Sequence, residues 1–131
     1  MRLEFKVIGE DSPDLKIVRA TLNEWGRIDL RGGSLELIPT ETVLLQNYPN
    51  PFNVRTVIRY GLPFRCRIRL VVYNLEGQEV RELVDGWREG GYYLVTWDGK
   101  DENGKNVSTG VYLVRMEAGR FSQVKKIVLL K

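Results

Sequence analysis

Apolar and polar side chains alternate along most of this chain, which is the pattern of β-strands that bury one face. The alternation predicts strands over residues 56–62, 65–74, 92–97 and 110–117, and a closing strand over 120–130. In residues 65–74 the expected inward and outward sets are clear: Cys66, Ile68, Leu70 and Val72 against Arg65, Arg67, Arg69 and Val71.

Two neighbouring segments break the simple alternation. Within residues 78–85, Val80 and Leu83 lie three positions apart, which predicts a strand with a bulge. Residues 86–91 begin and end with glycine and predict a turn. With a first strand at 43–46, the pattern gives seven short strands separated by turn residues. It predicts an all-β fold, an antiparallel immunoglobulin-like β-sandwich, with four large aromatic side chains in its core: Tyr60, Tyr93, Trp97 and Tyr112.

A few extra strands are predicted before the sandwich. Residues 2–8 alternate, a second strand is expected over 16–23, and residues 25–30 and 34–38 predict a hairpin across Arg31-Gly32-Gly33. So few strands bury too little area to close a core. The sequence therefore predicts a partial β module at 1–38, a linker with the first strand at 39–46, and the sandwich at 47–131.

The segment Asn47–Asn53 joins the two parts. Its two prolines, one residue apart, fix their own φ angles and bias the preceding residues toward extended conformations. We expect a stiff lead-in without internal hydrogen bonds, anchored by the packing of Tyr48 and Phe52. A docking epitope is the alternative, but a lead-in whose aromatic rings fill the end of the sandwich is favoured.

Charge is divided unevenly between the two parts. The net charge of +3 combines six Lys/Arg against eight Asp/Glu in residues 1–43 with fourteen against nine in residues 44–131. No apolar run is long enough to span a bilayer, and residues 1–15 lack the apolar core of a secretory signal. If the protein is exported, we expect a longer precursor to carry that signal.

The residue types disfavour an enzyme. The chain has no histidine and a single cysteine, which excludes Ser-His and Cys-His nucleophile pairs, thiolate metal clusters and an intrachain disulfide. Carboxylates stand singly in turns or on exposed faces, and no glycine-rich phosphate loop leads into a helix. We therefore expect no catalytic residues and no cofactor, and we expect Cys66 to be a small core residue.

Two groups of polar residues suggest ligands. Asp98, Asp101 and Asn103 alternate as calcium-binding oxygens do, but the full loop spacing is absent and tight turns select the same residues. Outward arginines at positions 59, 65, 67 and 69 could form a stripe for phosphate groups. Few aromatic residues interleave with them, so nucleic acid is not expected, and a solvated face is favoured.

Separated motifs in one order carry a family resemblance over residues 44–131. They are "LLQNYPNPFN", "VVYNLEGQEVRELVDG", "GGYYLVTWDGKDENGKNVSTGVYLVRMEAG" and "KKIVLLK". This part resembles the C-terminal sorting domain of proteins exported by the type IX secretion system, which shares its immunoglobulin-like fold with the flagellar hook-capping protein. The family usually has proline at the position of Val54. The motif residues expected to be structural are Tyr48, Pro49, Asn50, Pro51, Phe52, Trp97, Asp98, Gly99, Gly110 and Tyr112.

The resemblance implies a non-enzymatic address label on an exported protein. Its implied partners are an outer-membrane export machinery and a sortase, and its implied location is extracellular or at the cell surface, reached through the periplasm and outer membrane. Transferred to this chain, the terminal strand is the recognition element, which strand addition at a sheet edge would allow. Its expected residues are Lys125, Lys126, Val128, Leu129, Leu130 and Lys131.

Residues 1–38 are similar to the closing strands of a cohesin-like β-sandwich. The similarity lies in "LEFKVIG", "VRATLNEWGRIDL" and "GGSLELIP". Strand edges left unpaired there would allow homo-oligomers. The alternative function is therefore a structural or adhesive immunoglobulin-like module of a cell-surface or cellulosome-like protein.

Overall fold

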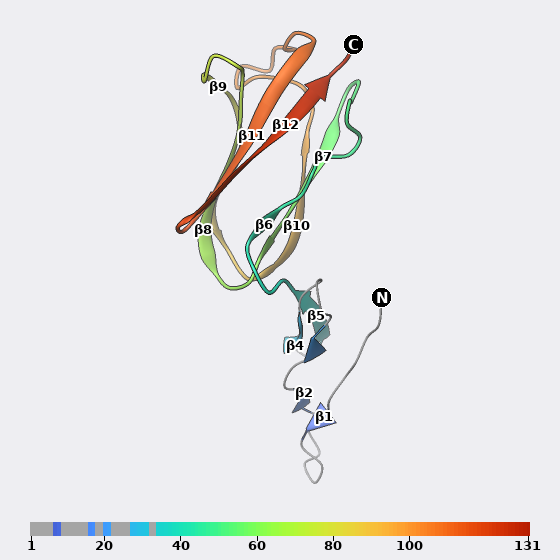
Figure 1. The fold of residues 1–131 in the computed structure, drawn as a ribbon, viewed down its shortest axis with the longest axis vertical. Helices are drawn as coiled ribbons and strands as arrows, with labels where there is room; N and C mark the ends of the chain where they lie inside the picture. The colour runs from blue at the N-terminus through green and yellow to red at the C-terminus, as the bar shows by residue number, and fades with distance from the viewer. Residues whose placement is uncertain (1–6, 9–15, 18–19, 22–26, 32–33) are drawn as a thin grey trace.

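The structure is a computed structural model that describes residues 7–8, 16–17, 20–21, 27–31 and 34–131, with side chains from residue 37 onward. Within those residues the chain forms strands and turns and no helix, as predicted (Figure 1). No helix of this described part is long and apolar enough to cross a membrane.

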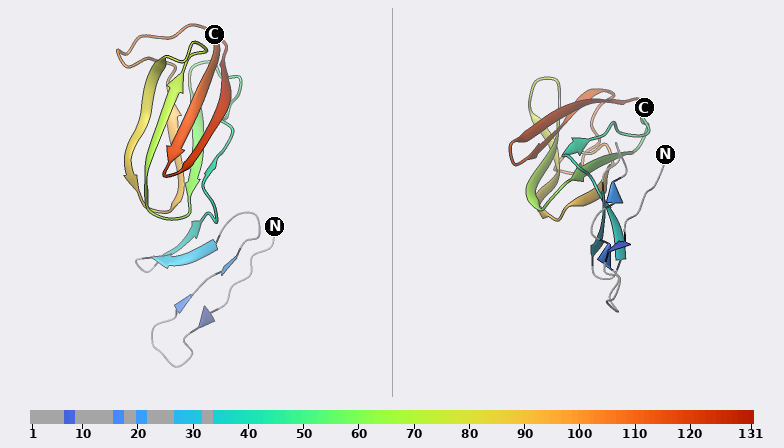
Figure 2. Two further views of the ribbon diagram at one scale, coloured as in Figure 1. Left: turned by 60° about the vertical axis from the view of Figure 1, so that its left-hand side comes forward. Right: turned by 60° about the horizontal axis from the view of Figure 1, so that its bottom comes forward.

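Residues 43–131 form a sandwich of two antiparallel sheets that face each other (Figures 1 and 2). One sheet has the order β10-β7-β6, and the other has the order β12-β11-β8-β9. The all-β immunoglobulin-like prediction is confirmed, with the expected number of strands. Their bounds are β6 Val43–Leu44, β7 Thr56–Leu62, β8 Cys66–Tyr73, β9 Glu79–Arg88, β10 Gly91–Trp97, β11 Gly110–Ala118 and β12 Phe121–Leu129.

The core lies between the two sheets and is built from the inward sets that the alternation predicts. Ile58, Tyr60 and Leu62 of β7 face Ile68, Leu70 and Val72 of β8, and all are buried. Trp97 is fully buried within it, with ring centroids 5.6 Å from Phe52 and 5.4 Å from Tyr112. The ring of Tyr93 stacks on Tyr60 at 5.3 Å. Interleaved aromatic rings supply the apolar area that so thin a domain needs.

Three expectations about β8 and β9 need correction. Val71 was expected in the outward set with the arginines; it is not part of the core cluster, yet it is only 1% exposed, because Arg115 and Glu82 on the neighbouring strands flank it with long side chains. Cys66 is only partly buried. Residues 86–88 continue β9 instead of turning, since Gly86 at φ 155° still pairs with Ile68. The predicted bulge is confirmed by register shifts between β8 and β9.

The strands before the sandwich form two further sheets. β1 (Val7–Ile8) pairs with β2 (Lys16–Ile17), and β3 (Ala20–Thr21), β4 (Arg27–Arg31) and β5 (Ser34–Ile38) pair in that order. The predicted β4–β5 hairpin is confirmed, whereas the single strand expected over 16–23 is two short strands in different sheets. Residues 2–6 of the first predicted strand lie outside the described residues. The division at 38 and 46 and the homo-oligomer remain predictions.

Candidate functional site

The lead-in Asn47–Asn53 crosses from one sheet of the sandwich to the other. Tyr48 pairs with Val57 of β7, through backbone hydrogen bonds of 3.0 and 2.9 Å. Four residues later Phe52 forms a parallel bridge with Leu129 of β12. The two X-Pro bonds within the segment, before Pro49 and Pro51, are cis. The lead-in thereby links the start of the sandwich to its terminal strand.

The two aromatic residues of the lead-in have opposite environments. Phe52 is 2% exposed and packs on Trp97, as predicted. Tyr48 is 73% exposed, so the expectation that it anchors the segment is wrong. Side chains of directly paired residues point to the same face of a sheet, and the partner of Tyr48 is Val57, which belongs to the outer set of β7.

A buried polar network fixes the turn of the lead-in. The Asn47 side chain is buried, and its Nδ2 donates to Thr56 Oγ1 at 2.9 Å and to Pro49 O at 3.1 Å. Thr56 Oγ1 donates to Pro49 O at 2.8 Å, and Gln46 Nε2 donates to Asn47 Oδ1 at 2.7 Å. The expectation of no internal hydrogen bonds was therefore wrong. Sequence reasoning missed Asn47, whose position just before the proline pair was the available signal.

The lead-in closes the second half of β12 along its free edge. β12 is an edge strand, because its other side pairs with β11. Phe52 N donates to Val128 O at 2.9 Å, and Leu130 N donates to Phe52 O at 2.9 Å. The Val128 N–H donates to Asn50 Oδ1 at 3.0 Å. From Val128 to Leu130 the outward backbone groups Val128 N, Val128 O and Leu130 N are therefore already hydrogen-bonded and cannot pair with a partner strand.

The first half of β12 is open along the same edge. Both backbone groups of Val128 face the lead-in, so in an antiparallel pair the even-numbered residues of β12 face away from β11. The outward backbone groups of this half belong to Ser122, Val124 and Lys126. They make one hydrogen bond to another described residue, which Gln46 Nε2 donates to Lys126 O at 2.9 Å. Strand β6 runs beside this edge, and Leu44 N donates to Gln123 Oε1 at 3.3 Å. Side-chain hydrogen bonds, and not a backbone ladder, therefore connect β6 and the nearby Gln46 to β12.

A groove lies against the open edge. It encloses about 630 Å³ and is lined by the linker at residues 39–43 and by Phe121, Ser122 and Gln123 of β12. The groove therefore adjoins the open edge at Ser122 and Gln123. We call Ser122–Lys126 with this groove the open edge, and Val128–Leu130 with its lead-in the closed edge.

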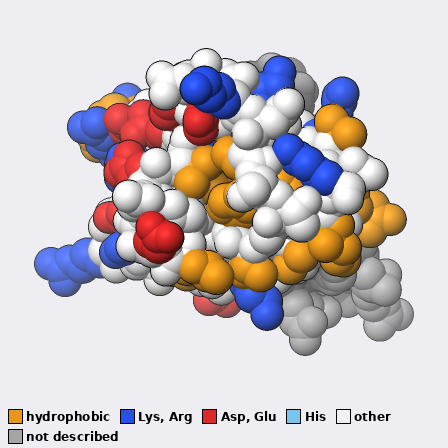
Figure 3. Space-filling model, turned by 90° about the horizontal axis from the view of Figure 1, so that it is seen from above, with side chains coloured by type: hydrophobic (Ala, Val, Ile, Leu, Met, Phe, Trp, Pro, Cys, Tyr) orange, Lys and Arg blue, Asp and Glu red, His pale blue; other side chains and the backbone are white. Residues whose placement is uncertain are grey.

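The predicted recognition residues are divided between these two edges. Leu129 is fully buried, Val128 and Lys125 are partly buried, and Leu130 and the other two lysines are exposed. Lys131 Nζ donates to Val107 O at 2.6 Å. Seen from the end that carries Lys131, basic side chains stand apart around the rim while acidic ones gather on one side (Figure 3). The structure therefore does not bring the three lysines into one basic patch.

The turn after Trp97 uses its carboxylates internally. Asp98 Oδ1 accepts from Lys100 N at 3.1 Å, and Asp101 Oδ1 accepts from the amides of Asn103 and Lys105 at 2.9 and 3.0 Å. Among the described residues no group of three acidic, cysteine or histidine side chains could hold a metal ion. Trp97 Nε1 donates to Lys100 O at 3.0 Å, and Gly99 adopts φ 72°. These contacts are those of a tight turn docked on the core.

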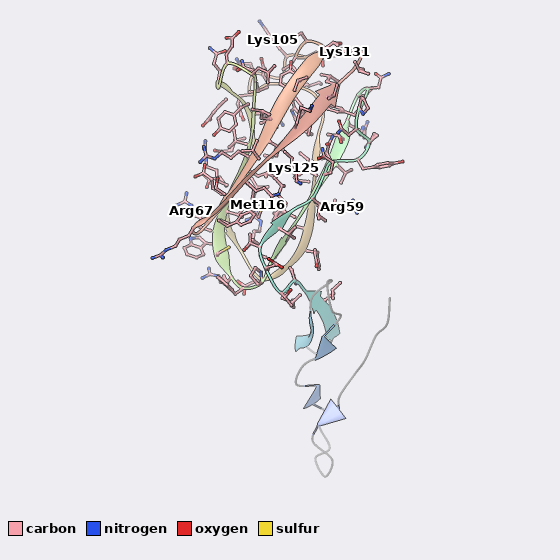
Figure 4. All side chains as sticks on the ribbon, in the orientation of Figure 1. Arg59, Arg67, Lys105, Met116, Lys125 and Lys131 are labelled. Atoms are coloured by element: carbon pink, nitrogen blue, oxygen red, sulfur yellow. The ribbon has the colours of Figure 1, made fainter. Side chains whose placement is uncertain are left out.

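The arginines do not form one stripe. Arg59 lies on β7 and Arg67 on β8, in different sheets and on opposite sides of the sandwich (Figure 4). The arginines of the β8 side form ion pairs: Arg65 with Glu89 at 2.9 Å, Arg67 with Asp85 at 3.1 Å, and Arg69 with Glu79 at 2.6 Å and Glu82 at 2.9 Å. The hydrogen bond that Arg69 donates to the Glu79 carboxylate raises the pKa of Arg69. Their charge is balanced within the face.

Residues 67–121 match the FlgD Ig-like domain. The match takes in nearly all of β8, all of β9 to β11, and stops at the first residue of β12. It confirms the immunoglobulin-like relation on which the sequence resemblance rests. No curated protein matches the chain.

Two solved structures have the same fold. Dimeric latent PorU from Porphyromonas gingivalis superposes with a TM-score of 0.54 and 18% identity, over 69% of this chain and 9% of its own. PorZ, an essential surface component of the type IX secretion system of that organism, superposes with a TM-score of 0.51 and 17% identity, over 93% of this chain and 18% of its own. At these identities the likeness shows the fold, and this chain spans a small part of either protein.

Proposed function

We propose that residues 43–131 act as a non-enzymatic C-terminal sorting domain, which directs an exported protein through the type IX secretion system to the cell surface. The observation that carries the proposal is the open edge of β12. At Ser122 and Val124 it has outward backbone groups that make no hydrogen bond to another described residue, and it adds one exposed valine and one exposed lysine near a groove. This edge belongs to the strand that the family resemblance assigns to recognition. The similarity in fold to PorZ, a surface component of that system, supports the same assignment.

Recognition at this edge takes the form of strand addition. An extended segment of the export machinery pairs with Ser122, Val124 and Lys126, while Lys126 gives it a positive contact. The closed edge fixes the position of β12, and the backbone of its first half, Ser122–Lys126, remains accessible to a partner strand. This assignment changes the set of residues expected to contact the export machinery. Leu129 is buried and supports the strand from within, whereas Val124 is added to Lys126 as a contact residue.

The test is export of a reporter fused to the whole chain in a bacterium that has this secretion system. Val124→Pro removes an outward N–H that β11 does not use, so it blocks strand addition while the ladder to β11 stays intact. Lys126→Glu reverses the contact charge. We expect both variants to leave the reporter in the periplasm.

The matched controls are Val124→Thr, which keeps the N–H, and Lys105→Glu, which makes the same charge change on a distant exposed turn. Both should reach the surface as the unaltered chain does. Thermal unfolding of each variant separates lost recognition from lost folding. Export of folded Val124→Pro and Lys126→Glu at the unaltered level would reject this recognition site and favour the alternative, a structural or adhesive module.

A further inference from the structure

The outer face of the sheet β10-β7-β6 is apolar and exposed. Leu94 is 69% exposed, Tyr92 39% and Leu37 37%. With Leu45 and Arg59 they line a shallow groove of about 330 Å³. Tyrosine and arginine are enriched at the centres of protein interfaces, and the leucines add apolar area that a partner could bury. We call these five residues the Arg59 face.

One end of the Arg59 face is already occupied by the chain itself. Ile38, the last residue of β5, and Pro39, which follows it, are buried, and β5 contacts β10 (Figure 1). A Cβ on Gly61 would lie 2.8 Å from Pro39 Cγ and 3.0 Å from Tyr92 Cε1. Gly61 lies inside β7, where glycine marks a close approach of another segment. The missing side chain therefore makes the seat for Pro39.

We propose that the Arg59 face is a docking surface for the N-terminal module of this chain, residues 1–36, and that it holds the module and the sandwich in one relative orientation. Tyr92 lines both the space over Gly61 that Pro39 fills and the Arg59 face, so the two surfaces are continuous. The chain that enters this space at Pro39 therefore also brings the preceding module close to the Arg59 face. Burial raises the pKa of Tyr92, whose ring lines both the seat and the face.

The charge of Arg59 also favours the N-terminal module as the segment that docks on the Arg59 face. No ion pair joins Arg59 to another residue in the part of the chain that the structure describes with side chains. Residues 1–36 carry seven acidic against six basic side chains, whereas residues 44–131 carry nine against fourteen. A module with a slight excess of acidic side chains, placed over an exposed arginine, gains electrostatic complementarity.

A second copy of the chain fits the face less well. Arg59 pairs with Leu94 across β7 and β10, so it lies in the middle of the apolar area. A two-fold axis through that area would bring two arginines together in a contact that excludes water. Like charges so placed are costly.

The test measures the distance between module and sandwich in the full chain. Cys66→Ala removes the native thiol, and spin labels are placed at position 34 on β5 and position 105 on the far end of the sandwich. Dilution with unlabelled protein removes contributions from neighbouring copies. We expect a single narrow distance distribution.

Two variants should broaden that distribution. Gly61→Val fills the seat of Pro39 with a residue that suits a strand, and Leu94→Lys places a second positive charge on the face. Leu75→Lys is the control, because Leu75 on the distant hairpin is 68% exposed against 69% for Leu94. Thermal unfolding confirms that the sandwich remains folded, and the exposed Leu94→Lys remains informative if Gly61→Val is unstable.

A narrow distribution that broadens in both folded variants and not in Leu75→Lys supports the proposal. A broad distribution in the unaltered chain would overturn it, because the linker would then be a free tether. A narrow distribution that neither variant changes would also overturn it, since the orientation would be held elsewhere. A distance that appears only without dilution would assign the face to a second copy instead.

Discussion

The two halves of β12 belong to one strand, share one neighbour and differ in what covers their free edge. From Val128 to Leu130 the lead-in supplies three hydrogen bonds and a buried ring. From Ser122 to Lys126, two glutamine side chains make the contacts across this free edge with the other described residues: Gln123 Oε1 accepts from Leu44 N of β6, and Gln46 Nε2 donates to Lys126 O. A sheet edge is ordinarily protected along its whole length. An edge protected over one half and open over the other is suited to controlled pairing with a partner.

The largest effect should come from removing the ring that anchors the closed edge. Phe52→Ala deletes a side chain that is 2% exposed and packed on Trp97. We expect the free energy of unfolding to fall by about 3–5 kcal/mol, the usual cost of truncating a buried aromatic. Urea unfolding measures it, with Phe64→Ala, at 65% exposure, as a near-neutral control. Equal losses in the two variants would show that the lead-in does not anchor β12.

A smaller effect is expected from the polar network that turns the lead-in toward β12. Asn47→Ala leaves the buried Thr56 hydroxyl without its donor and removes the acceptor of Gln46 Nε2. We expect a loss of about 1–3 kcal/mol, the penalty for disrupting buried hydrogen bonds. Asn103→Ala, on an exposed turn, is the control and should change little. A neutral Asn47→Ala would mean that the prolines alone direct the lead-in.

The bridge across the open edge should contribute less to global stability than the Asn47 network and more to local protection. Gln46→Ala removes the hydrogen bonds that Gln46 Nε2 donates to Lys126 O and to Asn47 Oδ1, at an expected cost of about 0.5–1.5 kcal/mol for each bond. In the unaltered chain the amides of Val128 and Leu130 should exchange slowly with solvent and the amide of Val124 fast. Slow exchange at Val124 in the monomer would show that this edge is covered, and the comparison between the halves would fail.

Local alternation was enough to predict most of the strands. Residues 56–62 form β7 to the residue, and the inward sets of β7, β8 and β11 are buried as expected except for the partly buried Cys66. The hairpin over Arg31-Gly32-Gly33 also follows from a pattern within a few residues. These features depend on neighbours in sequence, which a single chain displays directly.

The candidate site could be predicted only in part, because it depends on which strands become neighbours. The terminal strand was identified, but the division of its edge follows from the path of the lead-in between two sheets. That path also decides that Phe52 is buried while Tyr48 is exposed. The separation of Arg59 from Arg67 has the same origin, since consecutive strands β7 and β8 enter different sheets.

The smallest predicted effect concerns how far the closed edge extends. Lys131 N donates to Thr109 Oγ1 at 3.1 Å and its Nζ donates to Val107 O at 2.6 Å, so this residue is tied to the loop before β11. The contacts are exposed, and exposed charged contacts contribute about 1 kcal/mol at most. Lys131→Ala should therefore change global stability by no more than Lys126→Ala does, yet speed amide exchange at Leu130. Unchanged exchange at Leu130 would mean that Phe52 alone holds this edge in place. The closed edge would then depend on the packing of Phe52 and not on the contacts of Lys131.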